Sequence, residues 1–226
     1  MSEIVQLPNV QDVQDAQDAQ DAQRDELIKR IVELVRGGKL VVIPTDTTYA
    51  VIADPFHQGA VDLVRTAKGQ ASNVSLPIGA GSIETIMGVA HITGLALDLV
   101  RSLWPGQLTV MVAPQPSVQL KNVPAGNALS VRVPKDDFSQ AVLAGIGPTV
   151  MTGANAQGKQ MPTTIKQAQE QLGEQVSLYV DGGSLSGAQS SIVDATGQNL
   201  RLVREGALSL KAIREVVPMV VNATLL

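Results

Sequence analysis

The sequence contains no cysteine, very few aromatic residues and no excess of positive charge. Its 226 residues include one Trp, two Tyr and two Phe, and the formal net charge is −4. The lack of cysteine excludes disulfide frameworks, thiolate catalysis and cysteine-ligated zinc, and it fits a reducing compartment. The aromatic rings are too few to form a platform on which single-stranded bases stack. Thiol enzymes and base-stacking RNA-binding modules are therefore poor candidates for this protein.

Long apolar runs are also absent. No stretch reaches the roughly 18 apolar residues that a membrane helix requires, and the chain does not open with a basic and then apolar leader. We therefore expect a cytoplasmic protein without a membrane segment. With 44% hydrophobic and 17% charged residues, the composition is typical of a globular domain with a sizeable core.

Negative charge is concentrated at the N-terminus. Residues 1–23 hold five acidic residues and no Lys or Arg, which leaves a formal charge of +1 on the rest of the chain. Such a near-neutral body argues against a broad nucleic-acid-binding face. The repeat QDVQDAQDAQDAQ (11–23) has a period of three, so its alanines spiral around a helix and form no single core stripe. We predict an acidic, low-complexity leader over residues 1–24, mobile or a frayed helix, followed by a folded domain over residues 25–226.

Helical and strand-like segments alternate through that domain. Short apolar runs predict strands, and several strand pairs have no helix between them. This order predicts an α/β (α+β) fold, a single domain with a twisted mixed sheet flanked by helices. The expected strands are 39–43, 75–80, 107–114, 128–134, 148–155, 176–183, 190–196 and 200–206. The expected helices are 25–38, 58–68, 82–90, 92–104, 136–147, 163–173 and 208–217.

Motifs built on an obvious reactive group are missing. The sequence has no G-x-x-x-x-G-K-[ST], no G-x-G-x-x-G, no G-x-S-x-G and no H-E-x-x-H. Its two histidines, His57 and His91, stand alone, and a lone histidine is more often structural than catalytic. We therefore expect no protein-bound metal, although a magnesium ion carried by a nucleotide would need few protein ligands.

Polar side chains instead gather at the ends of predicted elements, where ligands bind in open α/β sheets. The segment PTDTTYA (44–50) follows an apolar run and places three threonines around one carboxylate. Lys68 ends a helix, whereas Arg132 lies within an apolar strand, where an unpaired charge is costly and a functional role is favoured. Glycine-rich segments at 152–158 and 181–196 supply further amides and hydroxyls.

Structural interpretations of these residues stay open. Thr45 and Thr47 could satisfy backbone groups after a strand that ends in proline, and Asn155 could be a turn residue. Lys68 could be a solvated residue that the dipole favours at a helix C-terminus. Arg204 could simply pair with a nearby carboxylate.

Taken in order, these segments resemble the YrdC-like family of threonylcarbamoyl-adenylate synthases. The family strings run roughly P-T-D-T-x-Y-G-L, K-x-R, W-P-G-P-L-T, V-R-x-P, S-x-N, S-T-I-V-D and R-x-G-A. Their counterparts here are PTDTTYAV, KGQ, WPGQLT, VRVP, GAN, SSIVD and REGA. Order and approximate spacing hold from about residue 27 to 215. Each string alone is weak evidence, but all of them in register favour a shared fold and ancestry.

The resemblance implies a reaction in which L-threonine and bicarbonate form a carbamate that ATP, with magnesium, adenylates, releasing pyrophosphate. The product would supply a tRNA-modifying transferase complex, so this chain itself would bind RNA weakly or not at all. Such chemistry depends on geometry and fixed positive charge more than on acid–base groups. Lys68 and Arg132 would be the catalytic cations. The threonine pocket would comprise Thr45, Arg132, Thr152 and Ser190. The ATP-binding residues would be Lys68, Asn155, Thr163 and Arg204.

The chain departs from the family strings at positions that carry chemistry. Gln70 stands in place of the arginine of K-x-R, and a lost charge-assisted contact to phosphate costs roughly 1.5–3 kcal/mol. Gly153 replaces the serine of S-x-N, Ala50 replaces the glycine after tyrosine, and Ser75 takes the usual place of a proline.

Two interpretations of these departures stay open. In the first, which we favour, the chain is a working but divergent synthase in which Lys68 or another cation replaces the missing arginine. In the second, it is a paralogue that binds nucleotide or RNA without this reaction, as the paired changes at Gln70 and Gly153 would suggest. An RNA-binding module is a third alternative, which the near-neutral body weakens.

Overall fold

The structure is a computed structural model that describes residues 2–8 and 14–223. The strands are β1 (Glu3–Gln6), β2 (Leu40–Ile43), β3 (Ala50–Ala53), β4 (Ile78–Gly79), β5 (Ala90–His91), β6 (Leu108–Pro114), β7 (Leu129–Arg132), β8 (Thr149–Gly153), β9 (Val176–Asp181), β10 (Ser191–Asp194), β11 (Arg201–Arg204) and β12 (Val221–Asn222). The helices are α1 (Gln14–Arg36), α2 (Gln58–Lys68), α3 (Ile83–Met87), α4 (Gly94–Leu103), α5 (Asp137–Ile146), α6 (Ile165–Leu172) and α7 (Leu210–Val216), with a 3₁₀ turn η1 (Gly173–Gln175) after α6. None of the described helices is long and apolar enough to cross a membrane.

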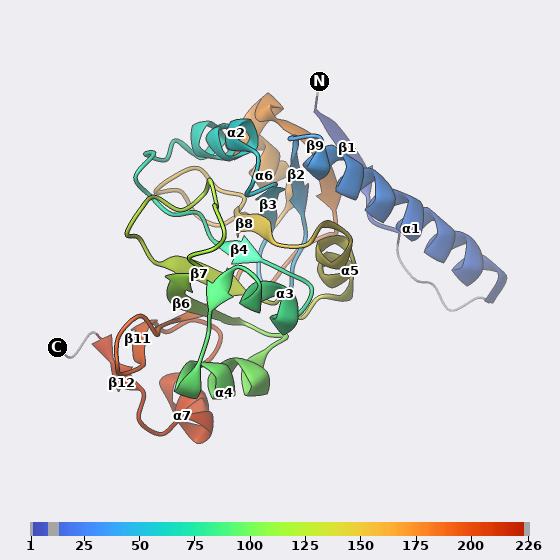
Figure 1. Cartoon of the computed structure of the whole chain (residues 1–226). Coiled ribbons are helices and arrows are strands. Elements are labelled where there is room, and N and C mark those ends of the chain that lie inside the picture. The colour runs from blue at the N-terminus through green and yellow to red at the C-terminus, as the bar shows by residue number, and fades with distance from the viewer. Residues whose placement is uncertain (1, 9–13, 224–226) are drawn as a thin grey trace.

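The strands form one mixed sheet in the order β1-β9-β2-β3-β8-β4-β7-β6-β10-β11-β12, with β5 paired separately to β6 (Figure 1). Parallel pairs such as β2–β9 and β6–β10 occur beside antiparallel pairs such as β2–β3 and β3–β8. The predicted α/β (α+β) fold, a single mixed sheet flanked by helices, is confirmed.

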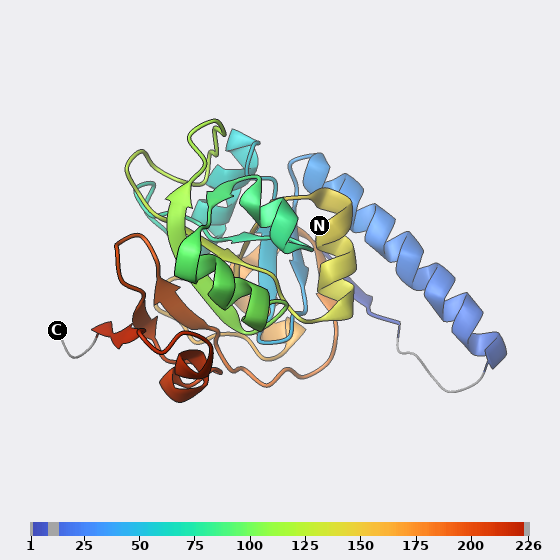
Figure 2. The same cartoon turned by 60° about the horizontal axis from the view of Figure 1, so that its bottom comes forward.

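Two layers of apolar side chains hold the helices to the sheet. Every residue of β2 is buried, because successive side chains of a strand point to opposite faces and both faces are covered. On one face, Val41 and Ile43 share a cluster with Ile31 of α1 and Phe138 of α5. Figure 2 shows α5 beside the C-terminal half of α1.

The second and larger cluster contains Leu40 and Val42 of β2 together with side chains from α2, α3, α4, α6 and α7. Burying each large aliphatic side chain contributes about 1.5–3 kcal/mol to folding. The residues of the sheet are therefore fixed by packing on both sides, and the loops at the strand ends rest on a rigid base.

The N-terminal segment differs from the sequence-based expectation. β1 pairs in parallel with β9, with Glu3 opposite Leu178 and Gln6 opposite Asp181. Folded structure therefore begins before Asp25, and the prediction that it starts there is wrong. The strand was missed because its apolar run is only two residues long and is bordered by polar ones. An ion pair between Glu3 and Arg30 also joins β1 to α1.

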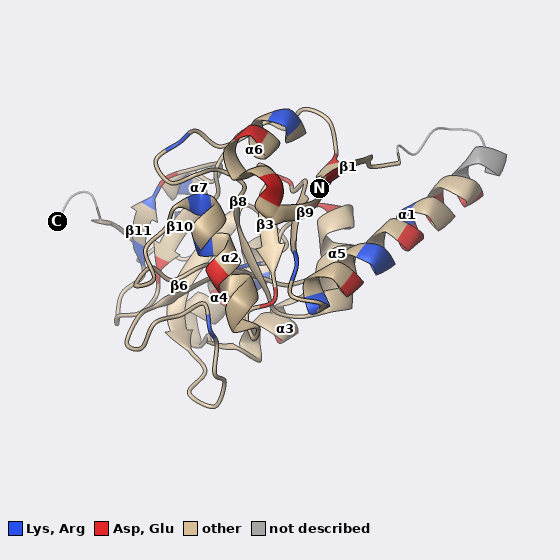
Figure 3. Ribbon diagram, turned by 90° about the horizontal axis from the view of Figure 1, so that it is seen from above, with Lys and Arg blue, Asp and Glu red and all other residues tan. Residues whose placement is uncertain are grey.

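The predicted acidic leader falls only partly on described residues. Residues 9–13 lie outside them, whereas residues 14–24 form the first turns of α1, which extends away from the body of the molecule (Figures 1 and 3). Figure 3 marks the positions of acidic and basic residues along the ribbon of α1. The division into a leader and a domain at residue 25 stays a prediction in all other respects.

Three further strands were not predicted from the sequence: β3, β5 and β12. Of these, β3 matters most, because it pairs with both β2 and β8 and turns the PTDTTYA segment into a tight connection between two buried strands. Thr164 is the N-cap of α6, and its side chain accepts a hydrogen bond from the backbone N–H of Gln167 in a capping box.

Candidate active site

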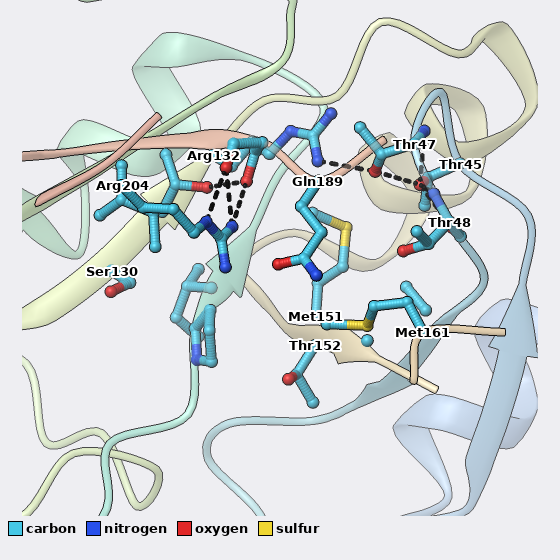
Figure 4. A pocket seen from close by; sticks show the side chains of 17 residues that line it. Thr45, Thr47, Thr48, Ser130, Arg132, Met151, Thr152, Met161, Gln189 and Arg204 are labelled. Carbon is cyan, nitrogen blue, oxygen red and sulfur yellow. Dashed lines mark hydrogen bonds between the residues drawn. The ribbon is translucent and has the colours of Figure 1, made fainter. Parts of the chain in front are cut away.

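A cavity of about 170 Å³ opens at the ends of the central strands (Figure 4). Its walls come from the β2–β3 loop, from strands β4, β6, β7, β8, β10 and β11, and from the loops that carry residues 161 and 189–190. The cavity thus lies at strand ends, where the sequence placed the polar clusters. The lining residues are Thr45, Thr47, Thr48, Ala50, Pro77, Ile78, Thr109, Ser130, Arg132, Met151, Thr152, Gly153, Met161, Gln189, Ser190, Ile192 and Arg204.

The β2–β3 loop presents a closed network of threonine hydroxyls to this cavity. Thr45 Oγ1 donates to the backbone oxygen of Thr48 at 2.7 Å and accepts from the backbone N–H groups of Thr47 and Thr48. The hydroxyls of Thr45 and Thr47 lie 3.1 Å apart. The structural interpretation of Thr45 is confirmed, because its hydroxyl satisfies the backbone of the turn. Thr45 also lines the cavity, and its contact with a substrate stays a prediction. All three threonines are buried, so the loop is rigid.

Arg132 lies at the centre of the cavity wall and is anchored on three sides. Its Nε donates to the backbone oxygen of Gly106 (2.9 Å), Nη1 donates to Thr47 Oγ1 (3.0 Å) and Nη2 donates to Asp46 Oδ1 (2.6 Å). A guanidinium has five N–H groups, so two remain for a ligand. Burial lowers the pKa of Arg132, while the adjacent carboxylate of Asp46 opposes that shift. The arginine stays charged, and its fork is held in one orientation.

Arg204 is the second cation of the cavity. Its Nε and Nη2 donate to the backbone oxygen of Ser190 at 3.0 and 2.7 Å. Within the described part of the chain, its Nη1 has no hydrogen-bond partner. It does not pair with Asp194, which binds Arg201, or with Glu205, which accepts from a backbone N–H. The ion-pair interpretation of Arg204 is therefore wrong, and burial lowers the pKa of this arginine.

The charges around the cavity do not cancel. Two guanidinium groups line it, and the charge of Arg204 adds to the lowering of the pKa of Arg132. Among the described carboxylates, only Asp46 is hydrogen-bonded to either arginine. A buried site with more positive than negative charge favours an anionic ligand such as a carboxylate, a carbamate or a phosphate.

Lys68 and Asn155, by contrast, do not line the cavity. Lys68 Nζ donates to the backbone oxygens of Gly153 (2.5 Å) and Asn155 (2.6 Å) and to Asn155 Oδ1 (3.2 Å). Burial lowers the pKa of Lys68 to about 8. The Asn155 amide donates to the backbone oxygens of Ala156 and Lys159. Lys68 is therefore not a solvated residue at a helix end, because it is buried and its ammonium group is bonded to three oxygens. Together with Asn155, it holds the segment at the end of β8.

Thr163 also lies outside the cavity. Its hydroxyl donates to Gln167 Oε1 at 3.2 Å, and its backbone oxygen accepts from the N–H of Leu185 at 2.9 Å. The same loop donates from Gly187 N–H to the backbone oxygen of Thr47 at 3.2 Å. Thr163 thus borders the loop that carries Gln189 and Ser190 into the cavity wall.

The structure brings together part of the predicted site. Thr45, Arg132, Thr152, Ser190 and Arg204 share one cavity, whereas Lys68, Asn155 and Thr163 do not line it. Every member of the predicted threonine pocket is inside, and the predicted ATP-binding residues are divided.

Several lining or supporting residues were not predicted. Asp46 could have been found from its place beside Thr45 and Thr47, because a buried arginine requires a carboxylate partner. Thr109 Oγ1 lies 2.9 Å from Ser190 Oγ, but nothing in the sequence of its strand indicates that this threonine has a functional role. Gln189 and Met161 lie in loops without a recognisable pattern.

Among the described residues, no group of three or more His, Asp or Glu side chains is placed to hold a metal ion. His57 is the N-cap of α2, where its Nδ1 accepts from the N–H of Ala60 at 3.1 Å. The expectation that this histidine is structural is confirmed.

Known proteins share both the sequence pattern and the fold. Residues 33–206 match the profile of the Sua5/YciO/YrdC family, whose description reads "telomere recombination". A protein of Mycobacterium tuberculosis, provisionally named a threonylcarbamoyl-AMP synthase, is 36% identical over 195 residues, which cover 85% of this chain and 90% of the relative. A threonylcarbamoyl-AMP synthase of Pyrococcus abyssi is 30% identical over 187 residues, which cover 81% of this chain and 55% of the relative.

The solved structure of P. abyssi Sua5 complexed with L-threonine has a TM-score of 0.85 to this chain at 24% identity. The match covers 98% of this chain and 62% of the Sua5 chain. The chain therefore spans less than two thirds of both P. abyssi proteins.

Proposed function

The chain belongs to the Sua5/YciO/YrdC family, and on that premise we propose that it forms L-threonylcarbamoyl-AMP and pyrophosphate from L-threonine, bicarbonate and ATP. Two relatives carry the name of this synthase, and a solved structure of the same fold holds L-threonine. The observation that carries the proposal for this chain is the pair of arginines, buried Arg132 and half-buried Arg204, that line one cavity together with several hydroxyl groups.

The charge of the cavity matches the reaction. The threonine amine attacks the carbon of bicarbonate, water leaves, and a carbamate oxygen then attacks the α-phosphorus of ATP with departure of pyrophosphate. Each step develops or moves negative charge, and none requires a protein nucleophile. Fixed guanidinium groups in a buried site stabilise such charge without reorganising.

We assign the threonine carboxylate to Arg132, which keeps two N–H groups for a ligand. The hydroxyls of Thr152 and Ser190 and the rigid Thr45 loop would complete the threonine pocket. Arg204 would direct its free Nη1 toward the phosphate groups of ATP. In this arrangement Arg132 binds threonine and Arg204 binds ATP.

Lys68, Asn155 and Thr163 enter the proposal differently. Lys68 gives all its donors to the loop after β8, so it would position Gly153 and the cavity wall while ATP is absent. A direct contact of Lys68 with ATP would require this loop to release the ammonium group. Nucleotide titration of a Lys68 variant distinguishes the two roles, because only direct contact raises the Kd for ATP without a loss of stability.

ATP would arrive as its magnesium complex. The product would pass to a tRNA-modifying transferase, so this chain would need to bind little or no RNA. We place this reaction in the cytoplasm. Chelation with EDTA should abolish turnover, and an excess of Mg²⁺ should restore it.

Purified full-length protein supplied with Mg²⁺, ATP, L-threonine and bicarbonate tests the proposal through pyrophosphate release. We expect release that depends on both threonine and bicarbonate, with omission of either as the control. ATP breakdown that is independent of threonine, or no breakdown at all, would show that the proposed reaction is wrong.

One observation favours a second candidate, a paralogue that binds nucleotide or RNA without turnover. Gln70 stands where the family has an arginine, and Gly153 stands where it has a serine, so two hydrogen-bonding side chains of the family are missing. Gln70 Oε1 is also buried without a partner among the described residues. Filter binding of RNA across a salt series decides the RNA branch. Binding at low salt without pyrophosphate release would support the paralogue, and absence of binding at low salt would remove its RNA branch.

A further inference from the structure

Gly153 lines the cavity, and the end of the Met161 side chain occupies the space beside its Cα atom. A Cβ atom built on Gly153 would lie 2.5 Å from Sδ and 2.8 Å from Cε of Met161, and 3.0 Å from Asn155 Oδ1. Real Cβ atoms do not approach other heavy atoms this closely. Met161 also lines the cavity. The thioether of Met161 therefore occupies the volume that a side chain at position 153 would take.

A second methionine is placed in the same manner. A Cβ atom on Gly79 would lie 2.6 Å from Cε and 2.7 Å from Sδ of Met151, which lines the cavity from β8. Met151 and Met161 are drawn on the far side of the cavity from Arg204 in Figure 4. Met161 packs against Gly153 and Met151 packs against Gly79, and the two methionines form an apolar wall of the cavity away from Arg204. Methionine is flexible and polarisable, and it fits irregular apolar surfaces.

We infer that Gly153 and Met161 act as one specificity-determining unit, which contacts the methyl group of the amino-acid substrate. The inference deepens the proposed function and rests on it. With its α-carboxylate bound to Arg132, a small amino acid would have its side chain within the cavity that Met151 and Met161 also line. L-threonine has one apolar group, its methyl, and serine lacks it. The Met161 thioether would therefore select threonine over serine.

The same contact explains why glycine at 153 is no simple loss of a serine. Only the end of the Met161 side chain and one amide oxygen stand in the way of a Cβ atom. A serine at 153 could therefore enter only by displacing Met161 from the wall. The same volume can be filled either by methionine at position 161 beside glycine at 153, or by serine at 153 beside a smaller residue at 161.

Four proteins form the test: the wild type, Gly153→Ser, Met161→Ala and the double variant. Gly197→Ser is the matched control, because Gly197 is exposed and a Cβ atom there meets nothing within 4 Å. Each protein is assayed for pyrophosphate release with L-threonine and with L-serine, for KM of ATP, and for thermal denaturation.

We expect Gly153→Ser to lower kcat/KM for threonine and not to raise it. Met161→Ala should reduce the threonine-to-serine ratio of kcat/KM about tenfold, which is at the low end of what one methyl group contributes. In the Met161→Ala background, the added Gly153→Ser should have little effect, because coupled positions are not additive.

Three results would overturn the inference. Gly153→Ser could have the same effect in both backgrounds, the threonine-to-serine ratio could survive Met161→Ala, or KM for ATP could change with that ratio intact. If the wild type releases no pyrophosphate, the proposed function fails separately. The coupling is then measured by denaturation, where Gly153→Ser should lower Tm more beside Met161 than beside alanine.

Discussion

Arg132 and Lys68 are both buried cations at the ends of secondary structure elements, yet they occupy opposite kinds of surroundings. Arg132 is 7% exposed, donates to one carboxylate, one hydroxyl and one backbone oxygen, keeps two unused N–H groups, and lines the cavity. Lys68 is 3% exposed and directs all three donors at oxygens of a single loop. A buried cation can bind a ligand without rearrangement only when some of its N–H groups are not already used in hydrogen bonds within the protein. By that criterion we propose that Arg132 binds substrate, whereas Lys68 holds the loop.

The largest effect is expected from removing the fork of Arg132 while keeping its charge. Arg132→Lys cannot reach Gly106, Asp46 and Thr47 at once and still offer two parallel donors to a carboxylate. Loss of one charge-assisted pair predicts a fall in kcat/KM for threonine of about a hundredfold. Steady-state pyrophosphate release measures it, with exposed Arg101→Lys as the control. Activity near that of the wild type would place the carboxylate elsewhere.

The second prediction concerns the stability that Lys68 gives the loop, and its dependence on pH. Burial lowers the pKa of Lys68 to about 8 in the folded protein, whereas an unfolded chain keeps the ordinary value of about 10.4. Below pH 8 both states hold the proton. Between the two values the unfolded state binds more protons, so the free energy of unfolding rises with pH.

Lys68→Met removes this titration. The stability of the wild type relative to Lys68→Met should therefore rise by about 2–3 kcal/mol from pH 7.5 to pH 10.5. Urea denaturation at a series of pH values measures it, with exposed Lys166→Met as the control. A difference that is flat across this range would mean that the three oxygens keep the pKa of Lys68 near its ordinary value.

A smaller effect is expected at Arg204, which is intermediate between Arg132 and Lys68 in the number of N–H groups left for a ligand. Its Nε and Nη2 already donate to the backbone oxygen of Ser190. Arg204→Gln should raise KM for ATP about tenfold and leave KM for threonine nearly unchanged, as one weakened charge-assisted contact predicts. Arg201→Gln on the same strand is the matched control, since Arg201 pairs with Asp194 and does not line the cavity. An equal rise in KM for threonine would remove the proposed division between the two arginines.

The smallest effect is expected from restoring a family cation at position 70. Gln70 follows the C-cap of α2, and its Oε1 atom is buried without a partner in the described part of the chain. Gln70→Arg should raise kcat/KM for ATP, by no more than about tenfold. Turnover at subsaturating ATP measures it. A decrease would indicate that the loop after α2 has adapted to a neutral side chain.

More of the fold than of the candidate site could be predicted from the sequence. Apolar runs located the long strands, because a strand buried on both faces has to be apolar throughout. The runs of β1, β5 and β12 are too short to stand out, and β3 follows a polar motif that reads as a loop. Their pairing is decided by neighbours far away in the chain, which local patterns do not contain.

The same limit divides the predicted site residues. Residue type and order were sufficient to place Thr45, Arg132, Ser190 and Arg204 at one cavity. They could not show that the backbone oxygens of 153 and 155 would turn toward Lys68, because that depends on the path of a loop. Nor could they show that Met161 would fill the volume left by Gly153, since a contact between two loop residues leaves no periodic signal.

The pairing of β1 with β9 has a practical consequence. Among the described strands, β1 is the outermost at its end of the sheet, and it covers the edge of β9 that faces away from β2. A truncated protein that begins at Asp25 would present that bare edge to solvent, and bare edges recruit strands from other molecules. Such a truncation should self-associate during purification even though its cavity is complete. We therefore expect residues 3–6 to protect the protein against aggregation by covering this edge.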